Sequence, residues 1–89
     1  MYKRNVTIVN DTGLHARPAA DFVAKAGSFL SNVTIRKEGN PIIANAKSIV
    51  FVLSLGIKQG DVLEVTAEGS DEKEAVDSLV ALVESAFGE

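Results

Sequence analysis

The residues best suited to chemistry lie in one short run near the start of the chain, from Thr12 to Ala19. This run holds the only histidine of the sequence, His15, and an arginine, Arg17, two positions later. A neutral imidazole is nucleophilic, and its ordinary pKa of about 6.5 leaves most of it neutral near pH 7. A guanidinium offers forked, charge-assisted hydrogen bonds that match phosphate oxygens. The pair therefore predicts a site that holds a phosphoryl group on a ring nitrogen.

A helix is expected to begin immediately after His15. Pro18 suits the first turn, because the N–H that it lacks would have no partner inside the helix. The N–H groups of Ala16 and Arg17 would face the imidazole, and the positive end of the helix dipole would favour a bound anion. Apolar residues then recur at helical spacing, with a glycine placed to end the helix: Ala19, Phe22, Val23, Ala26 and Gly27.

The rest of the pattern predicts strands and a last helix. Strands are expected over 6–9, from Val33, over 42–44 after a hairpin turn at 38–41, and over 63–68. In the last of these strands, apolar residues alternate with polar ones, which predicts one face in water. The final helix is expected to begin at the acids of 71–74 and to stop at Gly88. Its apolar stripe is Ala75, Val76, Leu79, Val80, Val83 and Phe87.

The segment 47–56 supports two interpretations. Its five consecutive apolar residues, 49–53, include three β-branched ones, and this composition favours a buried strand. As a helix, the run would be apolar nearly all round and would leave part of its surface exposed. An exposed apolar patch of that kind marks a partner surface, here formed by Ile49, Val50, Phe51 and Leu53. The pattern alone favours the strand.

Composition limits the classes of function. At 89 residues the chain is expected to form one domain, 1–89, with a modest core and no deep substrate cavity. A net charge of −3 without a basic cluster gives no reason to expect nucleic acid as a partner. The sequence has one histidine, no cysteine and no evident metal-ligand cluster. We therefore expect no bound metal, no cofactor and no independent enzymatic activity. We see no signal peptide or membrane span, so a cytoplasmic protein is expected.

The run Gly13-Leu14-His15-Ala16-Arg17-Pro18-Ala19 is followed by Lys47-Ser48-Ile49 and then by Ser54-Leu55-Gly56. Together, at this separation, these motifs resemble the HPr family, the histidine-containing phosphocarriers of the bacterial phosphoenolpyruvate-dependent sugar phosphotransferase system. The resemblance extends over essentially the whole chain. It implies an α+β fold, an open-faced β-sandwich in which a four-stranded antiparallel sheet carries three helices on one face, in the order β-α-β-β-α-β-α. It makes residues 48–53 a short helix, against the strand that the pattern favours.

The resemblance also implies roles for particular residues. His15 would accept the phosphoryl group from phospho-enzyme I, at Nδ1, and donate it to sugar-specific enzyme IIA domains. Arg17 would stabilise the phosphoryl group, and the exposed apolar residues of 49–53 would form the partner surface. Phe51 stands where many members carry glycine or a basic residue, which bears on the choice of partner. We expect a monomer that binds neither nucleic acid nor membrane.

Ser48 has a structural and a regulatory interpretation. As an N-cap, its hydroxyl would bond the backbone two or three residues later, typically worth about 1 kcal/mol. By its match to the regulatory serine of the family, it would be phosphorylated by an HPr kinase/phosphorylase. A phosphate there would place charge beside the apolar patch. That charge would weaken enzyme I docking and, in some bacteria, create a surface for a catabolite-control repressor.

Three other functions stay open. The nearest is a nitrogen-related phosphotransfer paralogue with the same chemistry and a regulatory output, although the 47–49 and 54–56 motifs favour the sugar branch. The second is a regulatory member of the family that does not carry a phosphoryl group, and the retained His15 argues against it. An unrelated α+β interaction module, in which His15 is incidental, is the third. It predicts no acid-labile phosphate with any donor.

Overall fold

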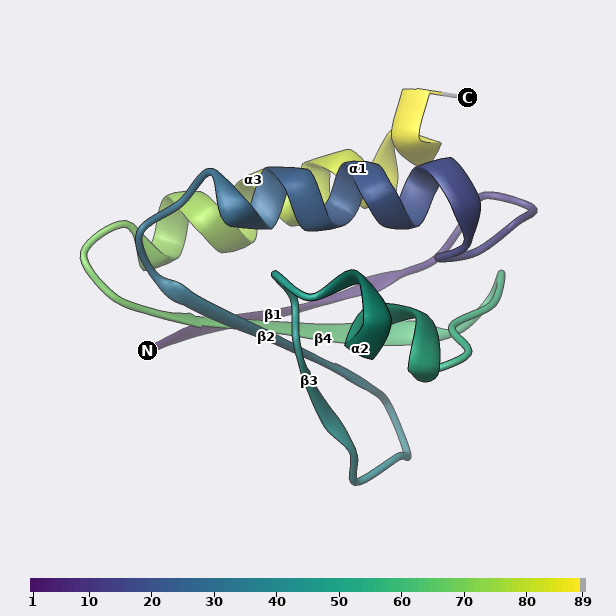
Figure 1. Ribbon diagram of the computed structural model, residues 1–89, viewed down its shortest axis with the longest axis horizontal. Coiled ribbons are helices and arrows are strands. Elements are labelled where there is room, and N and C mark those ends of the chain that lie inside the picture. Colours follow the sequence, from purple (N-terminus) through teal and green to yellow (C-terminus); the bar gives the residue numbers. More distant parts are fainter. Residues whose placement is uncertain (89) are drawn as a thin grey trace.

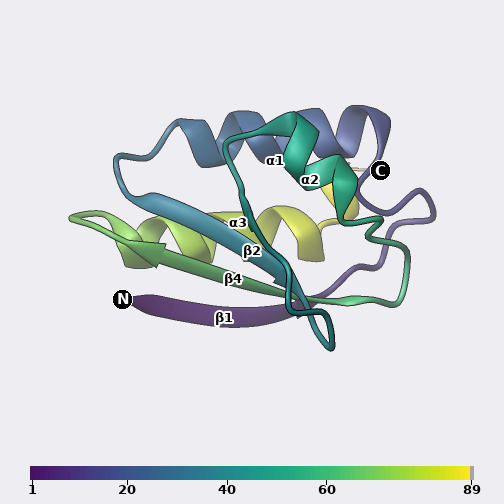
Figure 2. The ribbon, with the colours of Figure 1, turned by 60° about the horizontal axis from the view of Figure 1, so that its bottom comes forward.

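Three helices cover one face of a twisted four-stranded sheet in the computed structural model, which describes residues 1–88 (Figure 1). This arrangement confirms the expected fold class. Figure 2 shows the other face of the sheet without a helix over it. The strands are β1 (Tyr2–Thr7), β2 (Asn32–Lys37), β3 (Ile43–Asn45) and β4 (Val62–Glu68), and the helices are α1 (Ala16–Gly27), α2 (Ile49–Ser54) and α3 (Glu72–Glu84), with a 3₁₀ turn, η1, over Ala86–Gly88.

The sheet has the strand order β1-β4-β2-β3, and all neighbours are antiparallel. Val65 lies opposite Arg4 on one side and Ile35 on the other, so β4 is fully paired along its length. Alternate residues of the strands point towards the helices and join the buried side chains of α1 and α3 in a continuous apolar cluster. The sheet and the two long helices thus form the rigid body on which the loops at one end are held.

Helix α1 follows the predicted apolar spacing. Ala19, Phe22 and Ala26 are completely buried, and Val23 is half-buried against the same cluster. Residues three and four apart share a helix face, so these positions form the stripe that packs on the sheet. The helix ends at Gly27, as expected, and the burial of this stripe fixes the direction in which its first turn points.

The strand interpretation of 47–56 is wrong, and the helix implied by the family resemblance is confirmed. Ser48 is the N-cap of α2, and its hydroxyl accepts a hydrogen bond of 3.4 Å from the Phe51 amide. Within α2 only Val52 is buried, and Leu55 follows it into the core just after the helix. A cap and two buried anchors at helical spacing therefore outweigh the β propensity of the run.

Several predicted element ends differ from the structure. The first strand, predicted over 6–9, is β1, Tyr2–Thr7, and the strand predicted over 42–44 is β3, Ile43–Asn45. Helix α3 ends at Glu84, and not at Gly88. Ala86 and Phe87 adopt left-handed backbone conformations with φ of 55° and 58°. Such a conformation costs roughly 1–2 kcal/mol in a residue other than glycine. Phe87, predicted on the helix stripe, therefore reaches the core from a turn.

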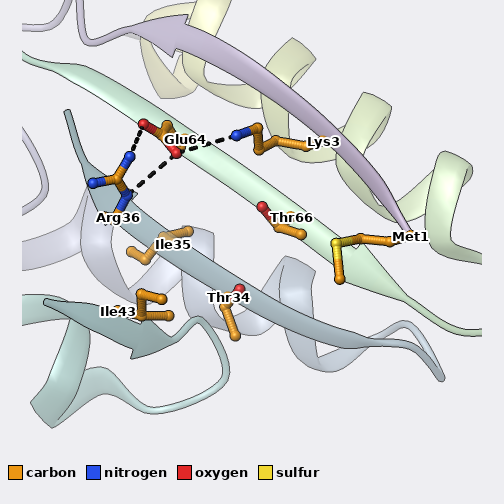
Figure 3. A pocket seen from close by; sticks show the side chains of 8 residues that line it. All are labelled: Met1, Lys3, Thr34, Ile35, Arg36, Ile43, Glu64 and Thr66. Carbon is orange, nitrogen blue, oxygen red and sulfur yellow. Dashed lines mark hydrogen bonds and ion pairs between the residues drawn. The ribbon is translucent and has the colours of Figure 1, made fainter. Parts of the chain in front are cut away.

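The open face of the sheet carries the polar side chains that the alternation predicted, but one of them, Glu64, is largely shielded from water. Glu64 on β4 points to this face but is only 9% exposed. The Arg36 guanidinium and the Lys3 ammonium bind its carboxylate from the two neighbouring strands, as Figure 3 shows. They hold the pKa of Glu64 below its ordinary value although its burial acts to raise it. These ion pairs join β1, β4 and β2 across a shallow hollow of about 490 Å³.

Candidate functional site

His15 is an exposed side chain at the N-cap of α1. Its backbone is extended, with φ −132° and ψ 161°, and its ring makes no capping hydrogen bond to the helix that it precedes. Within residues 1–88 the imidazole also has no ion-pair partner. The ring is therefore accessible to a second molecule. A group that accepts a phosphoryl group and passes it on needs this accessibility.

The loop before His15 is fixed by the backbone around Gly13. This glycine has φ +64°, and a Cβ placed on it would lie 2.4 Å from the carbonyl oxygen of Ile57. The next residue, Leu14, is completely buried, and its amide donates a 3.1 Å hydrogen bond to that same oxygen. Only a glycine can adopt this close left-handed approach without strain. The loop thus holds His15 at one place relative to the 57–58 backbone.

Asn10 supports this loop from inside. It is 4% exposed, and its Nδ2 group donates to the Gly13 carbonyl at 2.9 Å and to the Thr12 hydroxyl at 3.1 Å. Its Oδ1 atom is buried without a partner among residues 1–88. Nothing predicted from the sequence above assigns this role to Asn10. A turn-forming run directly before a reactive residue was the available signal.

The first turn of α1 presents backbone donors at the site. Within residues 1–88 the amides of Ala16 and Arg17 have no backbone acceptor, and Pro18 has no N–H. The Ala19 amide is the first to bond back, to the His15 carbonyl at 3.5 Å. Ala16 has a left-handed φ of 51°, a strained conformation of the kind that gathers at functional sites. The two free N–H groups and the helix dipole can stabilise an anion placed on His15.

Arg17 adds an exposed positive charge to this end of the helix. It is exposed, and within residues 1–88 it forms no ion pair or hydrogen bond through its guanidinium. It lines a hollow of about 260 Å³ together with Pro18, Asp21, Phe87 and Gly88. The predicted residues His15, Ala16 and Arg17 therefore lie at one end of one helix, while the hollow beside Arg17 was not foreseen.

An apolar patch on α2 completes the candidate site. We call it the α2 patch; Val50 and Phe51 are its most exposed members, at 68% and 56%. Helix α2 packs against α1, and the chain leaving α2 reaches Ile57, whose carbonyl holds the loop before His15. Ser48, at the start of α2, is half-buried. The exposure predicted for the helical interpretation is thus present at all four residues of the patch: Ile49, Val50, Phe51 and Leu53.

Among residues 1–88 no group of three histidine, cysteine or acidic side chains could hold a metal ion. No helix within the same residues is long and apolar enough to cross a membrane.

Sequence comparison connects this geometry to known proteins. Residues 2–85 match the family model PTS-HPr, described as the PTS HPr component phosphorylation site. The chain is 43% identical over 83 residues to the phosphocarrier protein HPr of Haemophilus influenzae, covering 93% of this chain and 95% of that protein. It is 43% identical over 84 residues to an HPr-like protein Crh of Halalkalibacterium halodurans, and 42% identical over 86 residues to a phosphocarrier protein NPr of Proteus mirabilis. These matches cover 94% and 97% of this chain, and 98% and 94% of the relatives.

Solved structures agree with these relatives. The structure of HPr-C-His from Thermoanaerobacter tengcongensis superposes with a TM-score of 0.95 at 49% identity, covering 100% of this chain and 98% of that one. An HPr dimer from the same organism superposes with a TM-score of 0.78 at 50% identity, with full coverage of both chains.

Proposed function

Since the chain belongs to the HPr family of phosphocarrier proteins, we propose that it carries a phosphoryl group on His15 within the phosphoenolpyruvate-dependent sugar phosphotransferase system. Proteins of this family are phosphocarriers and not independent enzymes. The observation that carries the proposal is the position of His15. It is exposed directly before α1, beside two free backbone N–H groups and an unpaired Arg17 within residues 1–88.

The transfer needs little from the protein beyond this arrangement. The lone pair on one ring nitrogen of neutral His15 forms a new bond to phosphorus as the bond between phosphorus and the donor breaks. The donor leaves with the electron pair of the bond that breaks, and the other ring nitrogen of His15 keeps its proton. The new phosphoryl oxygens are negative, so they accept from the Ala16 and Arg17 amides and from the Arg17 guanidinium. Reversal of this step on an acceptor passes the group on.

The α2 patch is proposed as the docking surface for the donor and the acceptors, phospho-enzyme I and enzyme IIA domains. It is apolar and exposed, and it lies on a helix that packs against α1. Exposed apolar patches of this kind mark protein interaction sites. Phe51 adds an aromatic ring to its centre, so the matching partner surface is expected to be apolar there.

Regulation at Ser48 is a further part of the proposal. Its hydroxyl caps α2 by accepting from the Phe51 amide, so a phosphate on it would sit at the start of the helix that carries the patch. The added charge would oppose docking of apolar partner surfaces. An HPr kinase/phosphorylase would supply the phosphate, and a catabolite-control repressor would be the reader of the modified surface.

Two relatives suggest other outputs for the same fold. The similarity to a protein named NPr favours a nitrogen-related role, and the similarity to one named Crh favours a regulatory role. We prefer the sugar branch because of the 47–49 and 54–56 motifs, and a carrier because His15 is retained. We propose a cytoplasmic monomer as the working form, with a dimer, as solved for the related Thermoanaerobacter tengcongensis HPr, as the alternative.

A phosphoryl relay tests this proposal. The chain is incubated with magnesium, enzyme I and radiolabelled phosphoenolpyruvate, and an enzyme IIA domain is then added. Label should pass from enzyme I to this chain and on to enzyme IIA, and His15→Ala should stop it at enzyme I. The relay is run in parallel with a sugar-branch and a nitrogen-branch enzyme I. The enzyme I that phosphorylates this chain faster identifies the branch in which the chain works. Label that never leaves either enzyme I would contradict the carrier role.

A further inference from the structure

The segment after α3 folds back on the start of α1. Figures 1 and 2 both place the C-terminal turn beside the first turn of that helix, although the two are far apart in sequence. Phe87 and Gly88 share the lining of one hollow with Arg17, Pro18 and Asp21. The family model ends at residue 85, so this turn lies beyond the part of the chain that the family pattern describes.

The turn is held in a conformation that it would not adopt unaided. Three consecutive residues, Ala86, Phe87 and Gly88, have positive φ values of 55°, 58° and 78°. The Gly88 amide donates to the Ser85 carbonyl at 3.1 Å, and the half-buried Phe87 ring packs against the core cluster. Left-handed residues other than glycine persist only where the surroundings fix them. The burial of Phe87 is the contact that fixes this turn.

We propose that Phe87 is a positioning residue for Arg17. This proposal rests on the proposed function of His15. Arg17 has four side-chain torsions and no polar partner among residues 1–88, so it can sweep a wide arc around the first turn of α1. The turn at 86–88 occupies one side of that arc. Because that side is closed, the guanidinium points towards a phosphoryl group on His15 for more of the time. The Arg17 side chain then loses less conformational entropy when it binds the phosphoryl oxygens.

The test measures an equilibrium, because an equilibrium does not depend on how well enzyme I docks. A catalytic amount of enzyme I brings the phosphoryl transfer to equilibrium. On one side are phosphoenolpyruvate and the unphosphorylated chain, and on the other are pyruvate and the phosphorylated chain. The ratio of phosphoenolpyruvate to pyruvate at half-phosphorylation reports the stability of the phosphorylated form. Phe87→Ala should raise that ratio about threefold, since part of the Arg17 contribution is lost. Phe87→Leu, which keeps an apolar anchor, should stay close to the unchanged chain.

A double-mutant cycle separates positioning from a general structural role. A residue that acts through Arg17 has no effect once that side chain is removed, so Phe87→Ala should leave the ratio of Arg17→Ala unchanged. Urea unfolding of each variant confirms that it is folded under the assay conditions. Leu30→Ala, an 84% exposed apolar position outside the site, is the control and should not move the ratio.

Each outcome has one meaning. A threefold effect of Phe87→Ala that vanishes in the Arg17→Ala background supports the inference. The same ratio for Phe87→Ala and the unchanged chain, or an effect that persists undiminished without Arg17, overturns it while the carrier function stands. No phosphorylation of the unchanged chain at any ratio overturns the proposed function itself and this inference with it.

Discussion

The amide of Leu14 and the carbonyl oxygen of Ile57 form a 3.1 Å hydrogen bond that joins the two halves of the candidate site. On one side of this bond, the loop continues directly into His15. On the other side, the chain has just left α2, which carries the apolar patch. The proposed phosphoryl acceptor and the proposed docking surface are thus fixed to each other through backbone, without depending on flexible side chains.

Gly13 is the residue that makes this bond possible. In Gly13→Ala, the new Cβ would meet the Ile57 oxygen at 2.4 Å and the residue would keep φ at +64°. We expect a loss of more than about 2 kcal/mol in the free energy of unfolding, measured with urea. Gly39→Ala is the matched control, because it also has a left-handed φ, of +88°, but no neighbouring atom within 4 Å of the new Cβ. A similar loss in both variants would mean that backbone strain, and not the close approach, is what matters.

Asn10 should matter more than its place in a surface turn suggests. Asn10→Ala removes the buried donor to the Gly13 carbonyl and leaves that oxygen without this partner. The expected cost is about 1–3 kcal/mol in urea unfolding, with slower phosphorylation because the loop that holds His15 is loosened. Thr12→Val removes only the second, exposed acceptor of the same amide and should cost far less. Equal costs for the two variants would contradict the role given to the Gly13 bond.

Asp71 should make stability depend on acid pH. Its carboxylate accepts from the Ser31 hydroxyl and from the amides of Leu30 and Ser31, and these bonds hold its pKa below the ordinary value of 3.8. Its contribution is therefore complete above about pH 5 and is lost as the pH falls towards and through the lower folded value. Asp71→Asn should flatten the dependence of urea stability on pH between about pH 5 and pH 2. Glu74→Gln, in an exposed position of the same first turn of α3, should keep the dependence of the unchanged chain.

The α2 patch should affect transfer without affecting folding. Phe51 is 56% exposed, so Phe51→Ser should leave urea stability nearly unchanged. If the ring fills a partner pocket, kcat/KM for phosphorylation by enzyme I should fall about tenfold, mainly through KM. Leu30→Ser, another exposed apolar position, should have no effect on the same assay. An unchanged kcat/KM for Phe51→Ser would remove Phe51 from the docking surface.

The fold was predictable where one physical signal dominated. The stripe Ala19, Phe22 and Ala26 predicted α1 because burial of a helix face is a strong periodic signal. The signal failed at α2, because most of the apolar run there is exposed and only Val52 within the helix is buried. What determines the helix is the Ser48 cap and the burial of Val52, and neither is visible in local propensity. There the family resemblance was the better guide.

The site was predictable only in part for a related reason. His15 and Arg17 are neighbours in sequence, so their types and spacing could be recognised directly. Asn10 acts through a buried hydrogen bond inside its own turn, which its residue type alone does not reveal. Phe87 lies near Arg17 through a tertiary contact, and the left-handed turn that carries it replaces the helix predicted to run on to Gly88. Glu64 is the same kind of case, since only the pairing of three strands brings Arg36 and Lys3 to its carboxylate.

The central claim is that His15 carries the phosphoryl group, and intact mass measures this most directly. The chain is incubated with enzyme I, magnesium and phosphoenolpyruvate, and its intact mass is measured before and after treatment with acid. We predict a gain of about 80 Da that acid removes and that His15→Ala does not show. A gain that survives acid, or one that His15→Ala also shows, would contradict the claim.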